Sequence, residues 1–489
     1  MKNKLVALLT LSSLLFLFFS GCIEDPNYSL DVEGGLVLKE QNSDIFIRAF
    51  SPHIEIEIRG FTGNIHLSNC NPGSEIKGVN SEPQIHNNSI TLKIEDDDIR
   101  TMSLEPPKKT DFDFTIIGDT QGMNHIFQSA VDDMDNIGFL IHLGDMTPSG
   151  GEDEYRGFQR VMNSAPFPIY TTIGNHDIKF DGRQYYEKNI APPQYSFTYD
   201  NLNFIFLDTS ELSIAQEQLD WMDSKLSQDH KNIIVTHAPY LDPFSDSHTI
   251  DKNSKNMVEK FINENDVYAY ISGHIHSYYQ DVSEGTIRLI TGGGGGSLVE
   301  GEHHYVMSTK DLNFSKIPID IEEPNIYEIR VVKGEQEETY TYESLLYDID
   351  AEGYSSFQNQ FGNRRGQGFY EGVKIRTLIQ SVGGMGENDT LVVESIDGYE
   401  QKFGYLNLYP DDVYMEKQGE LILALRYENL TIDEWDDGPR LVPLPEDGYY
   451  SNEDCQQTSY PGHGYNVYDS AGARWVKYVK SIKVMVDGN

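Results

Sequence analysis

Six short apolar runs between residues 112 and 271 constrain the fold more than any other feature of this chain. They cover residues 112–117, 139–142, 168–172, 203–207, 232–236 and 267–271, and each has the length of a buried β-strand. Helical stretches separate several of them. In one, 214–226, Leu219, Met222 and Leu226 share a face, and Ser213 with Gln216 fits a capping box. Strands that alternate with helices predict an α/β core.

The residues that follow these runs are types that bind metals. In open α/β sheets, ligand sites lie beyond the carboxyl ends of the strands, and glycine lets the backbone turn sharply there. Five separate strand ends carry such residues: Gly118-Asp119, Gly144-Asp145, Gly174-Asn175-His176-Asp177, His237 and Gly273-His274-Ile275-His276.

Carboxylate, amide oxygen and imidazole together are the ligand set of a hard-to-borderline divalent metal. Two such metals about 3.5–4 Å apart clamp the attacking and the leaving oxygen on phosphorus. A lone His-x-His or Gly-Asp is weak support, because single histidines are more often structural. All five pieces in this order, on strand ends, favour a two-metal site, with Asp145 as the carboxylate that bridges two mutually repelling cations.

In these motifs, extended by Thr120-Gln121 and by His237-Ala238-Pro239, residues 111–310 resemble the calcineurin-like metallophosphoesterase family. The resemblance implies an α/β fold, a four-layer αββα sandwich over 109–312. It implies a first metal held by Asp119, Gln121, Asp145 and His276, and a second held by Asp145, Asn175, His237 and His274.

The resemblance also gives roles to the two residues after Asn175. His176 is expected to contact phosphate and to protonate the leaving oxygen, and Asp177 to orient His176. One position departs from the family pattern, because Gln121 stands where the first motif usually has histidine. An amide oxygen is a neutral, weaker ligand than imidazole, so the first site is expected to bind metal less tightly or to prefer a harder ion such as Mn²⁺.

The expected reaction is the hydrolysis of a small phosphomonoester or phosphodiester. Two ions, of Mn, Fe or Zn, lower the pKa of a bound water, and the resulting hydroxide attacks phosphorus in line. Neither the substrate nor the metal follows from the sequence. Specificity in this fold is expected to lie in loops such as 146–167 and 238–255.

The first 22 residues are typical of a lipoprotein signal peptide. Lys2 and Lys4 precede an apolar run over 5–19, which ends in Ser20-Gly21-Cys22. We expect Cys22 to carry a lipid that anchors an extracytoplasmic protein to a membrane; the alternative is ordinary secretion. A net charge of −41 disfavours nucleic acid as a partner. The other two cysteines, Cys70 and Cys455, allow at most one disulfide.

The flanking regions are predicted to be β-rich. Residues 44–50, 54–59 and 89–95 alternate in period two, which indicates a small β-sandwich over 23–108. Residues 390–395 and 475–485 read as strands of an α+β domain over 322–489. This region resembles the molybdopterin-binding domain of sulfite-oxidase-like proteins. The resemblance rests, in chain order, on Phe361-Gly-Asn-Arg-Arg, Gly438-Pro-Arg and the strand from Ala473. That family's metal-binding cysteine is replaced here by Gln360 and Phe361, so the domain is expected to lack the cofactor and to serve binding or packing.

Two other functions stay open beside phosphoester hydrolysis. One is an oxidoreductase that uses the molybdopterin-like domain, and the other is a surface binding protein with a decayed phosphoesterase domain. Several local assignments are also open. Glycines 292–296 favour a flexible loop over a phosphate cradle, and His303 or His304 faces the pocket or enters the closing strand. Asp208 and His248 are assigned structural or solvent-facing roles.

Overall fold

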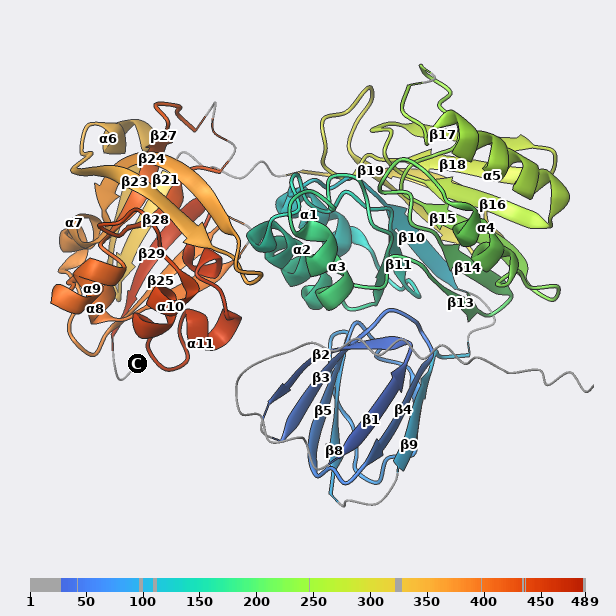
Figure 1. Cartoon of the computed structure of the whole chain (residues 1–489), viewed down its shortest axis with the longest axis horizontal. Coiled ribbons are helices and arrows are strands. Elements are labelled where there is room, and N and C mark those ends of the chain that lie inside the picture. Colours follow the sequence, from blue (N-terminus) through green and yellow to red (C-terminus); the bar gives the residue numbers. More distant parts are fainter. Residues whose placement is uncertain are drawn as a thin grey trace, which may run out of the picture.

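A computed structural model describes residues 28–41, 43–95, 100–108, 112–245, 247–321, 328–396, 398–432, 435 and 437–486. Three domains follow one another along the chain: an N-terminal domain, a central domain from residue 112 to 321, and a C-terminal domain from residue 328 (Figure 1). The predicted signal peptide and Cys22 lie outside the described residues. Among the residues described, no helix is both long and apolar enough to cross a membrane.

Two sheets form the middle of the central domain. The first has the order β12-β11-β10-β19-β20 and the second β13-β14-β15-β16-β18-β17. Strands β10, β11 and β12 run parallel to one another, as do β14, β15, β16 and β18. The bounds are β10 Asp113–Ile117, β11 Leu140–His142, β12 Ile169–Thr171, β13 Tyr195–Tyr199, β14 Leu202–Phe206, β15 Lys231–Thr236, β16 Val267–Ser272, β17 Tyr278–Ser283, β18 Thr286–Thr291, β19 His304–Thr309 and β20 Phe314–Pro318.

Helices flank these sheets on both outer sides, which gives the four layers that the sequence predicts. An aromatic core fills the space between the sheets, where the rings of Phe114 and Phe139 from the first meet Phe204 from the second. Side chains that alternate with these, such as Ile205 and Ile234, face the outer helices of the second sheet instead. The fold class is therefore confirmed. The helices are α1 Asn124–Asp133, α2 Glu152–Ser164, α3 Gly182–Asn189, α4 Gln216–Asp223 and α5 Lys252–Glu264.

Helix α4 is shorter than the sequence predicts. It begins after Ala215, not after Ser213, and the side chain of Gln218 accepts a hydrogen bond from the Ala215 amide at 2.9 Å. The predicted capping pair of Ser213 and Gln216 is wrong, because the chain stays extended for two more residues.

The N-terminal domain consists of two facing sheets, with the orders β1-β4-β9-β6 and β2-β3-β5-β8-β7. Isoleucine and leucine side chains from both sheets make its core, among them Ile47, Ile56 and Leu92. The bounds are β1 Ser29–Glu33, β2 Gly35–Gln41, β3 Asp44–Ala49, β4 Ile54–Arg59, β5 Gly63–Ser68, β6 Glu75–Lys77, β7 Gln84–His86, β8 Ser89–Ile94 and β9 Arg100–Glu105.

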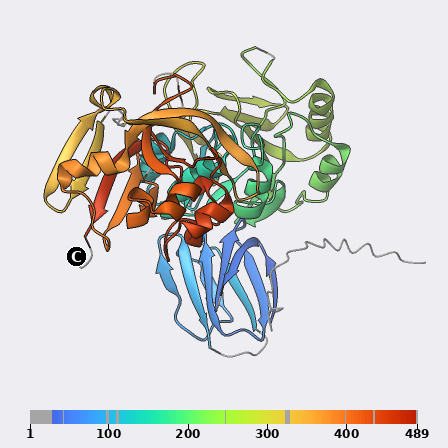
Figure 2. The ribbon, with the colours of Figure 1, turned by 60° about the vertical axis from the view of Figure 1, so that its left-hand side comes forward.

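The C-terminal domain packs short helices against two more sheets, β22-β21-β29-β25-β26 and β23-β24-β27-β28. It lies beside the central domain, on the side of α1 and α2 (Figures 1 and 2). Cys455 is buried within it and Cys70 within the N-terminal domain, and both are free thiols. The bounds are β21 Glu328–Lys333, β22 Gln336–Thr341, α6 Tyr342–Leu346, β23 Ala351–Gln358, β24 Arg364–Lys374, α7 Ile375–Leu378, η1 Ile379–Val382, β25 Thr390–Ser395, β26 Glu400–Phe403, α8 Tyr405–Leu408, α9 Asp412–Lys417, β27 Glu420–Tyr427, β28 Arg440–Leu444, α10 Asn452–Gln457, α11 Tyr465–Tyr468, η2 Gly472–Arg474 and β29 Val479–Met485.

Candidate metal centre

The predicted metal ligands converge at one edge of the central domain. Parallel strands from both sheets end there, and each ligand follows its strand within four residues: Asp119 and Gln121 after β10, Asp145 after β11, Asn175 after β12, His237 after β15, and His274 and His276 after β16. Residues that lie far apart in the sequence thus meet because the carboxyl ends of parallel strands share one edge.

One half of the site is formed by Asp145 and His237, which are buried, and by Asn175 and His274, which are half-buried. The Nδ1 of His237 bonds to the carbonyl of Leu143 at 2.9 Å, which leaves Nε2 with its lone pair free. That Nε2 lies 3.0 Å from Asn175 Oδ1 and 3.1 Å from His274 Nδ1. It also lies 3.4 Å from Asp145 Oδ1. Four acceptor atoms directed at one point fit a bound cation, which would satisfy all of them.

The second half contains Asp119, which is buried, and Gln121 and His276, which are half-buried. His276 Nδ1 bonds to the carbonyl of Ser297 at 2.8 Å, so its Nε2 faces Asp119 Oδ1 at 3.4 Å. The amide nitrogen of Gln121 lies 3.3 Å from His276 Nε2 and 3.3 Å from Asp145 Oδ2. Rotation of the terminal amide exchanges nitrogen for oxygen and completes an oxygen and imidazole ligand set for a second ion.

Asp145 lies between the two halves. One of its oxygens faces His237 and the other faces Gln121. Burial alone would raise the pKa of Asp145, but the neighbouring His237 and His176 lower it, so the group is an anion. This placement is the one that a bridging carboxylate requires.

Backbone strain is concentrated at the same ligands. Asp119, Gln121, Asp145 and His274 have φ angles of 61°, 44°, 51° and 66°, in the left-handed region that residues other than glycine rarely adopt. Such conformations persist where the surrounding structure imposes them, and they cluster at functional sites.

Residues 112–278 match the sequence profile of the calcineurin-like phosphoesterases. The central domain is a calcineurin-like phosphoesterase domain. A curated relative, a 3′,5′-cyclic-nucleotide phosphodiesterase of Nostoc sp., is 26% identical over 155 residues, which are 29% of this chain. The chain spans 58% of the length of that relative.

The similarity to solved structures is more distant. A dimetal phosphatase from Danio rerio is 14% identical, with a TM-score of 0.37, over 43% of this chain and 99% of its own. A purple acid phosphatase from yellow lupin is 12% identical, with a TM-score of 0.41, over 63% of this chain and 74% of its own.

His176 lies at the rim of the phosphoesterase site, and its backbone amide donates to Asp145 Oδ1 at 2.8 Å. Its Nδ1 lies 2.7 Å from the carbonyl of Pro148 and 2.8 Å from Lys179 Nζ. The Pro148 carbonyl only accepts, so Nδ1 donates to it, and Lys179 Nζ donates to the same carbonyl at 3.2 Å. The nitrogen that remains for a substrate is Nε2, which donates when the imidazole is protonated.

The expectation that Asp177 orients the His176 ring is wrong. The Asp177 carboxylate is fully buried and accepts hydrogen bonds from the amide of Gly174 and from the amide and hydroxyl of Thr147. Burial, together with the charge of Asp145, raises the pKa of Asp177 to about 7. Asp177 thus fixes the loop that begins at Thr147, and it acts on His176 only through Pro148.

The five glycines 292–296 do not form the flexible loop that the sequence favours. They are buried, and their backbone lies against the motif after β10, with Gly294 N donating to Gly118 O and Gly296 N to Asp119 O. A Cβ on Gly292 would lie 2.8 Å from Asp119 Oδ2, and one on Gly296 would lie 2.5 Å from His276 Cε1. Glycine is required here because the backbone passes so close to the ligands.

Three further residues lie outside the predicted ligand set: His304, Asp208 and His248. His304 is buried behind the glycine run and faces Tyr278, so it does not line the site. Asp208 pairs with Arg183 at 2.8 Å, as a structural residue does. His248, assigned no site role from the sequence, has its ring centroid 6.3 Å from that of His274 and is held by Asp242.

Sequence reasoning also missed Lys179. Its position three residues after His176 was the available signal, because a short turn brings such residues together.

Proposed function

We propose that this chain hydrolyses phosphomonoesters or phosphodiesters with a pair of metal ions held by the seven strand-end ligands. The observation that carries the proposal is the convergence of their lone pairs, with Asp145 between the two halves and His176 at the rim. When bound, the metal pair supplies Lewis acidity and an activated water. The Nostoc relative is a 3′,5′-cyclic-nucleotide phosphodiesterase, which makes 3′,5′-cyclic nucleotides the first natural substrates to test.

The chain's own residues have separate tasks in this reaction. Asp145 would hold the cations on both sides of it, because its anionic oxygens would offset their mutual repulsion. The buried His237 and the half-buried His274 would keep water from competing for one face of the site. His176, when protonated on both ring nitrogens, would stabilise the charge that develops on the phosphoryl oxygens and donate its Nε2 proton to the leaving oxygen, while Nδ1–H stays on the Pro148 carbonyl.

The test is the hydrolysis of p-nitrophenyl phosphate and bis-p-nitrophenyl phosphate by the full chain in detergent. The protein is stripped of metal and then supplied with Mn²⁺, Zn²⁺ or Fe²⁺. We expect metal-dependent turnover and its loss by more than about 100-fold in Asp145→Asn, since even residues behind the direct ligands contribute about 10–100-fold. Asp223→Asn, which changes an exposed carboxylate of α4, is the matched control. A folded protein that turns over neither ester with any metal would instead support a binding role.

We propose further that Cys22 is lipidated and that the enzyme is anchored outside the cytoplasm. The support is the order of charged, apolar and small residues in the first 22 positions. Detergent-phase partitioning of the full chain tests this, because Cys22→Ser should move the protein to the aqueous phase. Retention of the variant in the detergent phase would refute a lipid on Cys22.

For the C-terminal domain we propose a role in packing that requires no molybdopterin. Where the resembled family has its cysteine, the backbone amide of Gln360 donates to Glu152 of the phosphoesterase domain at 2.8 Å. Arg365 of the same segment pairs with Asp181 at 2.6 Å. Elemental analysis decides the matter, since stoichiometric molybdenum in the purified protein would favour the oxidoreductase alternative.

A further inference from the structure

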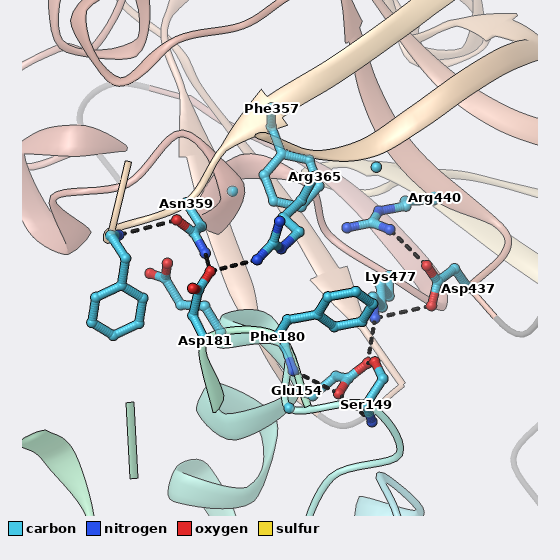
Figure 3. A pocket seen from close by; sticks show the side chains of 16 residues that line it. Ser149, Glu154, Phe180, Asp181, Phe357, Asn359, Arg365, Asp437, Arg440 and Lys477 are labelled. Carbon is cyan, nitrogen blue, oxygen red and sulfur yellow. Dashed lines mark hydrogen bonds and ion pairs between the residues drawn. The ribbon is translucent and has the colours of Figure 1, made fainter. Parts of the chain in front are cut away.

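The C-terminal domain contacts the phosphoesterase domain at the loops that surround His176. One loop joins β11 to α2 and contains Pro148 and Ser149; the other joins β12 to α3 and contains His176 and Asp181. Three carboxylates of these loops and of the start of α2 receive hydrogen bonds or ion pairs from the C-terminal domain. They are Glu152, Glu154 and Asp181. Figure 3 shows those of Glu154 and Asp181.

Glu154 connects the C-terminal domain to the loop after β11. Its carboxylate accepts from the amides of Ser149 and Gly151 at 3.0 and 2.9 Å, and from the Ser149 hydroxyl at 2.7 Å. On its other side lies Lys477 Nζ, 3.3 Å away. The Glu154 side chain is 8% exposed and that of Lys477 14%, so the pair is largely removed from water.

Asp181 connects the same domain to the loop after β12. It accepts from Asn359 at 2.7 Å and from Arg365 at 2.6 Å. The Arg365 guanidinium also lies over the ring of Phe180, 4.9 Å from its centroid. Figure 3 shows Phe180 and Phe357 on opposite sides of the pocket, with these ion pairs around it.

The two loops meet at His176. Pro148, the residue before Ser149, offers its carbonyl to His176 Nδ1 and to Lys179 Nζ. A displacement of Ser149 therefore moves the atom that fixes the direction of the imidazole. A cavity of about 240 Å³ between the loops and the C-terminal domain gives both loops room to shift once an ion pair is lost.

We propose that Lys477 and Arg365 are positioning residues for His176, so that the C-terminal domain is a working part of the phosphoesterase. This inference rests on the proposed function. Loss of Lys477 leaves the buried Glu154 carboxylate without the ammonium group beside it, which is strongly unfavourable unless the carboxylate turns toward water. When Glu154 turns, the hydrogen bonds to Ser149 and Gly151 break and Pro148 moves with them.

The first experiment compares esters that differ in their need for a proton donor. Phenyl phosphate has a poor leaving group, and 2,4-dinitrophenyl phosphate has a good one that leaves without protonation. For Lys477→Met in the metal-loaded full chain we expect kcat on phenyl phosphate to fall about tenfold, a fraction of what a general acid contributes, and on the dinitrophenyl ester less than about twofold. Lys477→Arg should restore most of the loss. Equal losses on both esters would overturn the proposal.

A double-mutant cycle identifies His176 as the target. In a His176→Asn background, Lys477→Met should cause no further loss on phenyl phosphate, because residues that act through one group are not additive. Additive losses would overturn the proposal. The matched control is Lys483→Met, which removes an ion pair with Glu394 inside the C-terminal domain and should leave both esters unaffected.

Hydrogen exchange gives a readout that requires no turnover. Lys477→Met should speed exchange of the Ser149 and Gly151 amides, both of which donate to Glu154, whereas Lys483→Met should not. Unchanged protection at these amides would refute the positioning role. If the unmodified chain hydrolyses neither ester, the proposed function fails, and hydrogen exchange still decides whether Lys477 holds the loop.

Discussion

The phosphoesterase domain contacts its two neighbours at opposite ends of the same strands, with different chemistry. At the amino-terminal ends, side chains of the N-terminal domain bond to its backbone. Asn69 accepts from Ile169 N and donates to Ile169 O, Asn71 donates to Gly138 O, and Asn88 to Met162 O and Phe167 O. At the carboxyl-terminal ends, the C-terminal domain uses Lys477 and Arg365 to pair with carboxylates.

The first contact attaches the N-terminal domain, whereas the second contact reaches loops of the active site. Hydrogen bonds from asparagine side chains to backbone groups near the starts of β11 and β12 hold the N-terminal domain in place. They lie at the end of the strands that is remote from the predicted metal ligands. The ion pairs act on loops that carry His176 and its neighbours. We therefore expect changes at the first contact to alter stability alone, and changes at the second to alter catalysis.

The largest effect is expected from Asn69→Ala. It removes both partners of the Ile169 backbone in a buried position, so the free energy of unfolding should fall by about 2–4 kcal/mol, the sum of two unsatisfied groups. Thermal unfolding measures this. The kcat on phenyl phosphate should not change, and a fall in kcat comparable to that of Lys477→Met would break the distinction between the two contacts.

A smaller effect is expected from Glu154→Gln, which keeps the shape of the side chain and removes its charge. Hydrogen bonds to a charged acceptor are stronger than those to a neutral one. The hydrogen bonds that the Ser149 and Gly151 amides donate to residue 154 therefore weaken. We expect kcat on phenyl phosphate to fall about fivefold, near 1 kcal/mol of activation free energy. Asp223→Asn is again the control, and an unchanged kcat would show that the charge of Glu154 has no part in positioning.

Arg48→Met should lower the free energy of unfolding by less than about 1 kcal/mol, or raise it. A buried charge without an anionic partner stabilises a protein little more than an apolar side chain of similar size. Arg48 is 2% exposed at the contact with the N-terminal domain, and it donates to Met162 Sδ and Asn163 Oδ1, neither of them a carboxylate. Burial lowers the pKa of Arg48 to about 10. A loss of several kcal/mol in chemical unfolding would show instead that the guanidinium is essential to the contact.

The smallest effect concerns salt. The Lys477 and Glu154 side chains are largely buried, and buried pairs are screened little. Between about 0.05 and 0.5 M NaCl we expect kcat on phenyl phosphate to fall by less than about twofold. A much steeper fall, absent in Lys477→Met, would place this ion pair in contact with solvent during turnover.

Much of the phosphoesterase domain follows from the sequence, because its signals are local. All six apolar runs are strands, and the glycines and ligand residues lie where those strands end. The roles of Asp177 and of glycines 292–296 could not be predicted, since both depend on which backbone passes nearby. Asp177 accepts from the adjoining loop instead of from His176, and the glycines lie against ligands about 170 residues earlier in the chain.

The sequence by itself determined which residue types follow which strands, and with them the phosphoesterase domain and the prediction of a two-metal site. Periodicity and strand-end motifs are properties of neighbouring residues, so a single chain displays them. Only the tertiary structure decided what surrounds the site. The pairing of Lys477 with Glu154 joins positions 323 residues apart, and no local pattern encodes such a contact, because it exists only after separate domains have folded and docked.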